Sequence, residues 1–112
     1  MISMVTAIYR MVLSPPIRDK QLSVIRLVLG PTRDEKGSLL ASLYRDTEDE
    51  NSLILLEEWE SREDLERHIR GKNFHRLLLM MDTLSEVPQV SIWPDCRKEG
   101  LKEVEEILGS RS

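Results

Sequence analysis

The sequence has few cysteines and no long apolar run. Cys96 is the only cysteine among 112 residues, so the chain can form neither an intrachain disulfide nor a cysteine-clustered metal site. This scarcity predicts a reducing, cytoplasmic setting. No apolar run approaches the roughly 20 residues that cross a bilayer. The apolar start lacks the basic region and cleavage site of a signal peptide. We therefore expect no membrane partner.

An excess of positive charge is also missing. Sixteen Lys and Arg face twenty Asp and Glu, which gives a net charge of −4, and no block of basic residues stands out. Nucleic acid is therefore not an expected partner. What the chain does contain is 40% hydrophobic and 32% charged residues over the length of one domain. This composition predicts a single core with a charged surface.

Four segments have the pattern of strands. Residues 4–13 alternate, and the runs that follow are similarly apolar. The later predicted strands are residues 38–45, 53–56 and 89–93. In the first three strands apolar residues fall on both sides, which predicts that both faces of the sheet are covered.

Helical periodicity accounts for most of the remainder. Residues 17–29 carry an apolar stripe, and Gly30-Pro31 predicts the end of this helix. Ser61 is a plausible N-cap with Asp64 at the capping-box position, so a second helix begins there. It is interrupted near Gly71 and resumes to Leu84. A short amphipathic helix after Gly100 is too small to stand alone.

The resulting order is β-α-β-β-α-β, which predicts an α+β, ferredoxin-like domain with both helices on one face of an antiparallel sheet. We assign residues 1–94 to this domain and residues 95–112 to a C-terminal helical extension. The second, apolar face predicts a homodimer in which two sheets face each other. The alternative is that the C-terminal helix alone covers that face.

The loop at residues 46–51 holds four acids within five residues. Such a run is compatible with a divalent cation. Because it joins two strand-like runs, a solvated hairpin tip is the simpler interpretation, and we predict no metal site.

The stretch from Tyr44 to His68 carries a resemblance to a known family. It consists of a strand, a D-x-E-D-x-N loop and the pattern L-L-E-E-W-E-S-R-E-x-L-x-x-H. With Gly37 and Phe74 in matching places, residues 3–93 resemble the antibiotic biosynthesis monooxygenase (ABM) family. The resemblance implies a dimeric α+β barrel of two ferredoxin-like subunits. Family members include cofactor-free oxygenases acting on quinols and anthrones, haem-degrading enzymes and proteins without assigned activity.

The resemblance therefore implies a cofactor-independent monooxygenase acting on a small aromatic substrate. A deprotonated phenol or quinol can give an electron to O₂ without a metal or flavin, provided that the protein supplies a dry pocket, a base and oxyanion stabilisation. The alternative is a non-catalytic dimeric module that binds a small molecule or is purely structural. An enclosed cavity reached by His68 would favour an oxygenase or a binding module, and a filled core would favour a structural module.

Haem degradation fits the sequence poorly. By resemblance, that branch needs an Asn on the first strand, and none is present. The position of its helical Trp holds His68, and the position of its haem ligand holds Leu78. His75 lies three residues short of that position.

His68 is the predicted catalytic base, because its ordinary pKa lies near neutrality and it shares a helical face with Leu65. The alternative is a buried histidine satisfied by the backbone. Trp59 could stack on a planar substrate, or could only anchor the junction between strand and helix. Tyr9 and Tyr44 could donate hydrogen bonds to a substrate oxygen.

Two arginines complete the predicted substrate-binding set. Arg10 lies on the first strand and Arg45 on the second, and either could stabilise an anion. The alternative is that they pair with strand-edge acids such as Glu57 or Glu58.

Overall fold

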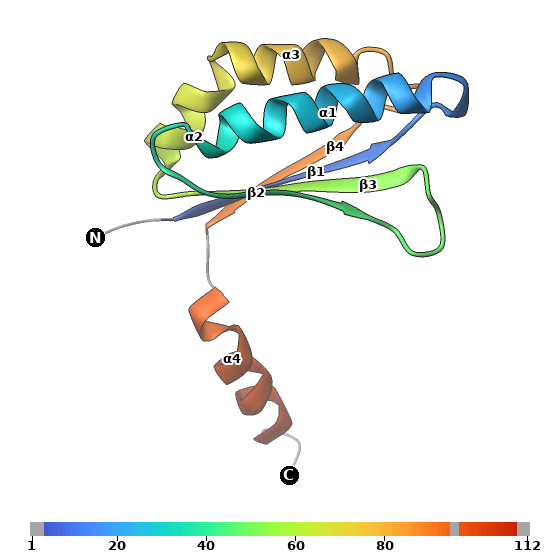
Figure 1. The fold of residues 1–112 in the computed structure, drawn as a ribbon. Coiled ribbons are helices and arrows are strands. Elements are labelled where there is room, and N and C mark those ends of the chain that lie inside the picture. Colours follow the sequence, from blue (N-terminus) through green and yellow to red (C-terminus); the bar gives the residue numbers. More distant parts are fainter. Residues whose placement is uncertain (1–3, 95–96, 110–112) are drawn as a thin grey trace.

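The computed structural model describes residues 4–94 and 97–109. The elements in chain order are β1 (Val5–Val12), a 3-10 helix (Pro15–Ile17), α1 (Arg18–Arg33), β2 (Ser38–Arg45), β3 (Ser52–Trp59), α2 (Arg62–Ile69), α3 (Lys72–Met81), β4 (Gln89–Pro94) and α4 (Arg97–Gly109). The sheet has the order β2-β3-β1-β4 with antiparallel neighbours. Helices α1, α2 and α3 lie on one face of it (Figure 1). The predicted α+β, ferredoxin-like fold is confirmed.

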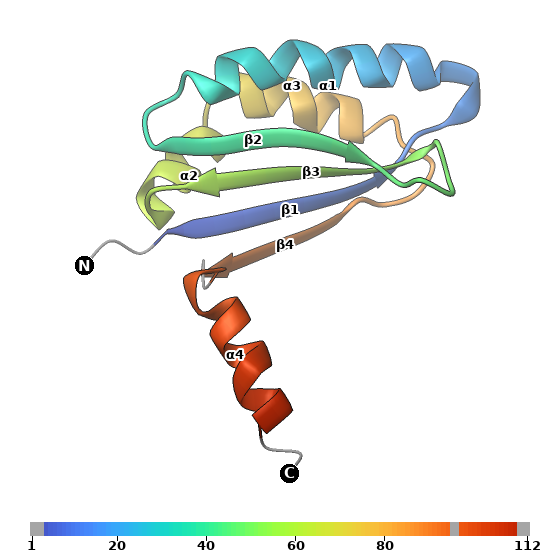
Figure 2. The same cartoon turned by 60° about the horizontal axis from the view of Figure 1, so that its bottom comes forward.

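The core lies between the sheet and the α1–α3 layer. The alternation in β1 puts Val5, Ala7, Tyr9 and Met11 under the helices, where all four are buried. The predicted stripe of α1 is buried against them, with Ile25 at its centre. Strands β1 and β3 occupy the middle of the sheet (Figure 2).

The predicted start of α2 is confirmed. The Ser61 Oγ accepts a hydrogen bond from the Asp64 backbone N–H at 3.1 Å and donates one to Asp64 Oδ2 at 2.9 Å. Arg67 Nη1 donates to Asp64 Oδ1 at 2.7 Å, and this bond and that from Ser61 lower the pKa of Asp64. The Asp64 side chain also packs on Gly37, which has a φ of +85°. The cap of α2 therefore also fixes the turn that precedes β2.

The predicted end of the first helix is wrong. Gly30 and Pro31 lie inside α1, which continues to Arg33. Proline in the last turn removes a single helical hydrogen bond, and the carbonyl of Pro31 accepts from the Asp34 N–H at 3.2 Å. The Arg33 Nε also donates to the Ala41 carbonyl at 2.9 Å, which ties this turn to β2.

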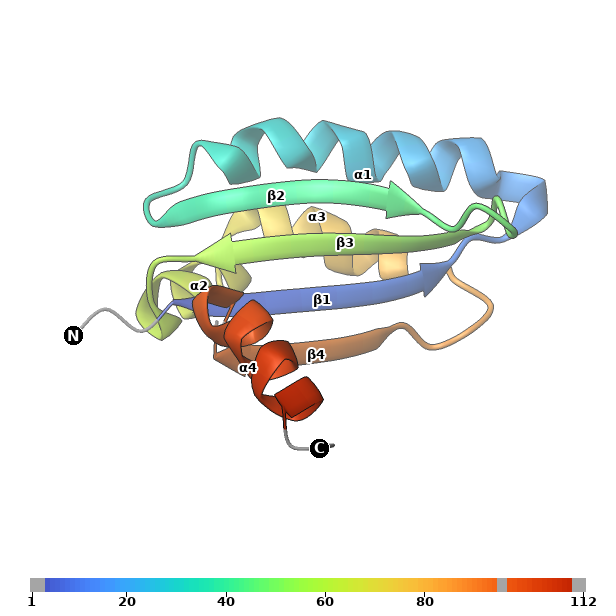
Figure 3. The ribbon, with the colours of Figure 1, turned by 90° about the horizontal axis from the view of Figure 1, so that it is seen from below.

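The sheet face opposite α1 and α3 is partly apolar. Register places Ile8 and Leu56 side by side on it, and Tyr44 and Trp93 lie on the same face. The side chains of Tyr44 and Trp93 are 51% and 59% exposed. We call this surface the open sheet face (Figure 3).

Helix α4 does not cover the open sheet face. It points away from the sheet on that side (Figure 1), and its apolar side chains are exposed. The alternative in which the C-terminal helix alone buries this face is therefore wrong for the single chain. The predicted domain boundary, at residue 95, lies outside the described residues. Among the described helices, none has the length and apolar character needed to span a membrane.

A candidate active site around His68

His68 lies on α2 and faces the sheet, with its side chain 1% exposed. Its two ring nitrogens point toward two different carboxylates. The Nδ1 atom lies 2.8 Å from Glu35 Oε2, and the Nε2 atom lies 3.3 Å from Glu57 Oε2. The imidazole is therefore held between an acid from the loop before β2 and an acid from β3.

The two contacts differ in kind. The Nδ1 contact is a hydrogen bond, whereas the Nε2 atom has no hydrogen-bond partner among the described residues. The 3.3 Å approach of Glu57 is thus electrostatic, without hydrogen-bond alignment. A buried polar atom left unpaired costs about 1–3 kcal/mol and needs an explanation. A proton on Nε2 would lie within ion-pair distance of Glu57 Oε2.

Glu57 connects His68 to the aromatic residues of the sheet. Its Oε1 atom accepts hydrogen bonds from the Tyr9 hydroxyl and the Trp59 Nε1, each at 3.2 Å. The alternation of β3 places Glu57 between Leu55 and Trp59 on the face under the helices, and it is 1% exposed. A buried carboxylate needs such donors, because burial without them is costly.

Aromatic rings pack around the imidazole. The Trp59 ring stacks on His68 with centroids 4.7 Å apart and an interplanar angle of 29°. Phe74 meets His68 edge-on at 5.5 Å, and Tyr9 lies 6.0 Å from Phe74. We call the rings of Trp59, Phe74 and Tyr9 the aromatic cage.

Glu35 comes from the turn between α1 and β2. Its Oε2 atom accepts from both His68 and the Asn73 Nδ2, the latter at 3.0 Å. Asn73 belongs to the first turn of α3, so the break between α2 and α3 near Gly71, which the sequence predicted, lets both residues face Glu35. The Glu35 side chain is 25% exposed and so reaches solvent.

The surroundings shift the pKa of two groups. Burial lowers the pKa of His68, but the neighbouring carboxylates of Glu57 and Glu35 outweigh it and raise that pKa above its ordinary value. Burial, followed by the charge of Glu57, raises the pKa of Tyr9 strongly. The Tyr9 phenol therefore stays protonated and donates to Glu57.

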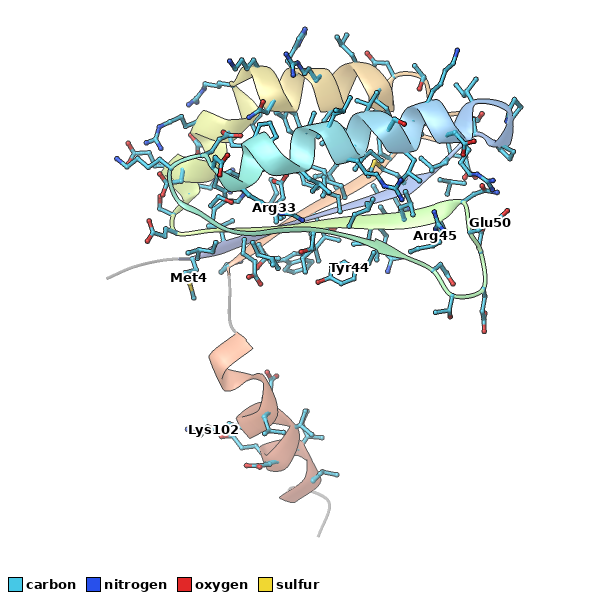
Figure 4. All side chains as sticks on the ribbon, in the orientation of Figure 1. Met4, Arg33, Tyr44, Arg45, Glu50 and Lys102 are labelled. Carbon is cyan, nitrogen blue, oxygen red and sulfur yellow. The ribbon has the colours of Figure 1, made fainter. Side chains whose placement is uncertain are left out.

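The structure brings together half of the predicted site residues. His68, Tyr9 and Trp59 share one cluster. Arg10 and Tyr44 do not join it, because they pair with Ile54 from either side on the open sheet face. In Figure 4 Tyr44 points away from the helices.

The remaining predicted residue, Arg45, is also distant. It pairs with Leu53, at the opposite end of β3 from Trp59. The proposed pairing of the arginines with strand-edge acids is wrong for Glu57, which lies in a central strand and contacts Tyr9, Trp59 and His68. Glu58 is buried in the same strand.

Sequence reasoning missed Glu57, Glu35 and Asn73 as site residues. The signal for Glu57 was present, because it occupies a core position in the two-residue alternation of β3. Glu35 gave no such signal, since it lies in a polar turn 33 residues before His68.

A surface hollow of about 550 Å³ lies between α1 and α3 and is lined by Val24, Leu27 and Leu79 among others. His68 does not line this hollow. Around His68 the space is filled by the aromatic cage. No group of three His, Cys, Asp or Glu side chains in residues 4–94 and 97–109 could hold a metal ion. Glu35 and Glu57 instead face opposite nitrogens of one ring.

Comparison with known proteins assigns the domain. The model of the antibiotic biosynthesis monooxygenase family matches residues 4–78. The chain belongs to the ABM family. Curated protein sequences give no significant match.

Solved structures agree with this ABM assignment. A conserved protein from Methanosarcina mazei Go1 is similar with a TM-score of 0.78 and 20% identity, over 84% of this chain and 94% of that one. Rv0793 from Mycobacterium tuberculosis has a TM-score of 0.76 and 23% identity, over 83% and 95%. A structure described as an antibiotic biosynthesis monooxygenase has a TM-score of 0.75 and 25% identity, over 81% and 97%.

Proposed function

We propose that this ABM protein is a cofactor-independent monooxygenase that acts on a small quinol- or anthrone-like substrate. The observation that carries the proposal is the state of His68, whose Nδ1 is fixed by a carboxylate while its buried Nε2 has no hydrogen-bond partner in the described chain. A base oriented by an acid through its other nitrogen is a recurring catalytic arrangement. Family membership supports the reaction class.

In the proposed reaction His68 Nε2 takes a proton from the substrate. The resulting anion passes one electron to O₂, and the two radicals combine to form a C–O bond in a peroxide anion. His68 returns its proton to this anion, which gives a hydroperoxide. Nε2 then takes the remaining proton from the same carbon as the O–O bond breaks, and it passes that proton to the departing hydroxide, which leaves a carbonyl and water. The raised pKa of His68 makes it a stronger base than free imidazole.

Two neighbours have separate roles in this scheme. Trp59, already stacked on His68, forms a wall against which a planar substrate lies. Tyr9 donates to Glu57 and so supports the acid that faces Nε2. Since His68 is 1% exposed, the aromatic cage has to open for the substrate to enter.

A non-catalytic binding or structural module is the second candidate. The observation that favours it is the close packing around His68, whose side chain is 1% exposed and contacts the rings of Trp59 and Phe74. In this alternative the cluster serves only to fix α2 and α3 on the sheet.

Oxygen uptake separates the two candidates. Pure protein should consume O₂ with quinols or anthrones without added metal or flavin, and His68→Gln should lower the rate at least about tenfold. His75→Gln is the matched control, because His75 is an exposed histidine on α3. No turnover across the panel would favour the second candidate, and an unchanged rate in His68→Gln would remove His68 from the role of base.

We also propose that the protein is a homodimer joined through the open sheet faces. The exposed Tyr44 and Trp93 and the neighbouring Ile8 and Leu56 support this arrangement. Arg10 and Tyr44 would then lie between the two sheets, where they could contact a small aromatic molecule. The cytoplasmic location expected from the single cysteine stays a prediction.

Sedimentation tests the dimer. Leu56→Lys places a charge on the open sheet face and should shift the protein to monomers. Leu27→Lys is the matched control, because Leu27 lies on the helix layer away from the open sheet face and is 70% exposed, and it should leave the mass unchanged. A wild-type protein that stays monomeric at micromolar concentration would exclude the sheet-face dimer.

A further inference from the structure

We infer that Glu35 is a positioning and proton-exchange residue, which fixes the His68 ring and carries its proton between the buried cluster and solvent. No other part of the chain offers a comparable route from this interior to the surface among the contacts described. The use of this route in turnover rests on the proposed function, whereas the route itself does not.

The route follows a line of polar contacts. The Tyr9 hydroxyl donates to Glu57 Oε1, and Glu57 Oε2 lies 3.3 Å from His68 Nε2. The His68 Nδ1 lies 2.8 Å from Glu35 Oε2. The side chains of Glu57 and His68 are 2% and 1% exposed, and that of Glu35 is 25% exposed. Glu35 is thus the solvent-exposed end of a series of polar contacts that runs from Tyr9 through Glu57 and His68.

The turn holds Glu35 in place for this role. Its backbone N–H donates to the Thr32 carbonyl and its carbonyl accepts from the Ser38 N–H, each at 3.1 Å. The Asn73 side chain donates to the same Oε2 atom that faces His68. The carboxylate is therefore fixed by its own backbone and by α3, and the imidazole cannot rotate without breaking its bond to it.

The contact selects one tautomer of the neutral ring. Because the Glu35 carboxylate accepts at Nδ1, the neutral imidazole carries its proton there and leaves Nε2 as the base. When Nε2 gains a proton, the Nδ1–H bond can break as an O–H bond forms on Glu35, and Glu35 then passes that proton to water. Each transfer forms one bond and breaks one, and the ring returns to neutrality with its proton on Nε2. The two reverse transfers restore the ring that is protonated on Nδ1.

Histidine NMR tests this role without any substrate. With ¹⁵N-labelled histidine, the Nδ1 proton of His68 should exchange with water through Glu35. Glu35→Gln keeps an acceptor oxygen but cannot carry a proton. It should slow that exchange at least about tenfold, as expected when a positioned acid–base group is removed. Glu35→Asp retains a carboxylate and should restore exchange relative to Gln.

The controls separate proton exchange from a purely structural role. A structural latch would loosen in Glu35→Gln, so exchange would become faster or stay unchanged, and either result overturns the inference. Glu48→Gln, in the exposed hairpin, should leave His68 exchange as in the wild type. His75 provides an internal reference in the same spectra. Because no turnover is measured, this result stands apart from the oxygen-uptake test of the proposed function.

Discussion

Replacement of Tyr9 by Phe tests whether the buried cluster is held by its hydrogen bonds. Tyr9 is 1% exposed, and its hydroxyl donates to a buried carboxylate at 3.2 Å. A hydrogen bond to a charged group contributes about 1.5–3 kcal/mol. The lower end applies here, because the bond is long and Trp59 still donates to the same oxygen. We therefore expect Tyr9→Phe to lower the free energy of unfolding by about 1.5 kcal/mol.

The size of this effect is within reach of ordinary denaturation experiments. An unfolding entropy of about 2.1 cal/mol/K per residue over 112 residues converts the loss into a melting temperature lower by about 6 °C. Urea unfolding at one fixed protein concentration gives the free energy, because self-association would make stability depend on concentration.

Tyr44→Phe is the matched control. Tyr44 is 51% exposed and has no hydrogen bond from its hydroxyl among the described contacts, so its variant should stay within about 0.5 kcal/mol of the wild type. If Tyr9→Phe were equally neutral, the carboxylate of Glu57 would not depend on the Tyr9 hydroxyl. The interpretation that hydrogen bonds to Glu57 hold the buried cluster together would then be refuted.

Two further predictions concern the same region. Because folding raises the pKa of His68, its contribution to stability is present below about pH 6.5 and is lost as the pH rises through the folded pKa. The stability of the wild type relative to His68→Gln, from urea unfolding at a series of pH values, should therefore fall above about pH 6.5; a rise would contradict the shift. Gly37→Ala should destabilise by about 1–3 kcal/mol, because Gly37 has a φ of +85° and a Cβ there would strike Asp64. In thermal melts Gly30→Ala, in an open position of α1, should instead be neutral or stabilising.

Local rules predicted most of the fold. The two-residue alternation placed β1 and β2 to within a residue, and the Ser61 cap placed the start of α2. These features depend on neighbouring residues, so a single sequence contains them. The end of α1 was missed because a proline in the last turn of a helix costs only one hydrogen bond. Rules that treat every proline as a helix breaker overstate this cost.

The candidate site was less predictable, because it is built from long-range contacts. His68, Tyr9 and Trp59 could be named from their chemistry, but nothing in the sequence separated Tyr9 from Tyr44, which points to the other face of the sheet. Glu35 and Glu57 reach the imidazole from positions 33 and 11 residues away along the chain. These contacts are set by the order of the strands in the sheet and by the turn before β2, and the spacing of the residues along the sequence does not reveal them.

The single side chain of Asp64 links two parts of the molecule mechanically. It caps α2, and it packs on the glycine of the turn that carries Glu35. An outward movement of the start of the helix or of the turn would therefore have to displace the Asp64 side chain. Access to the imidazole from this end of the domain is thus coupled to a residue that does not touch the imidazole.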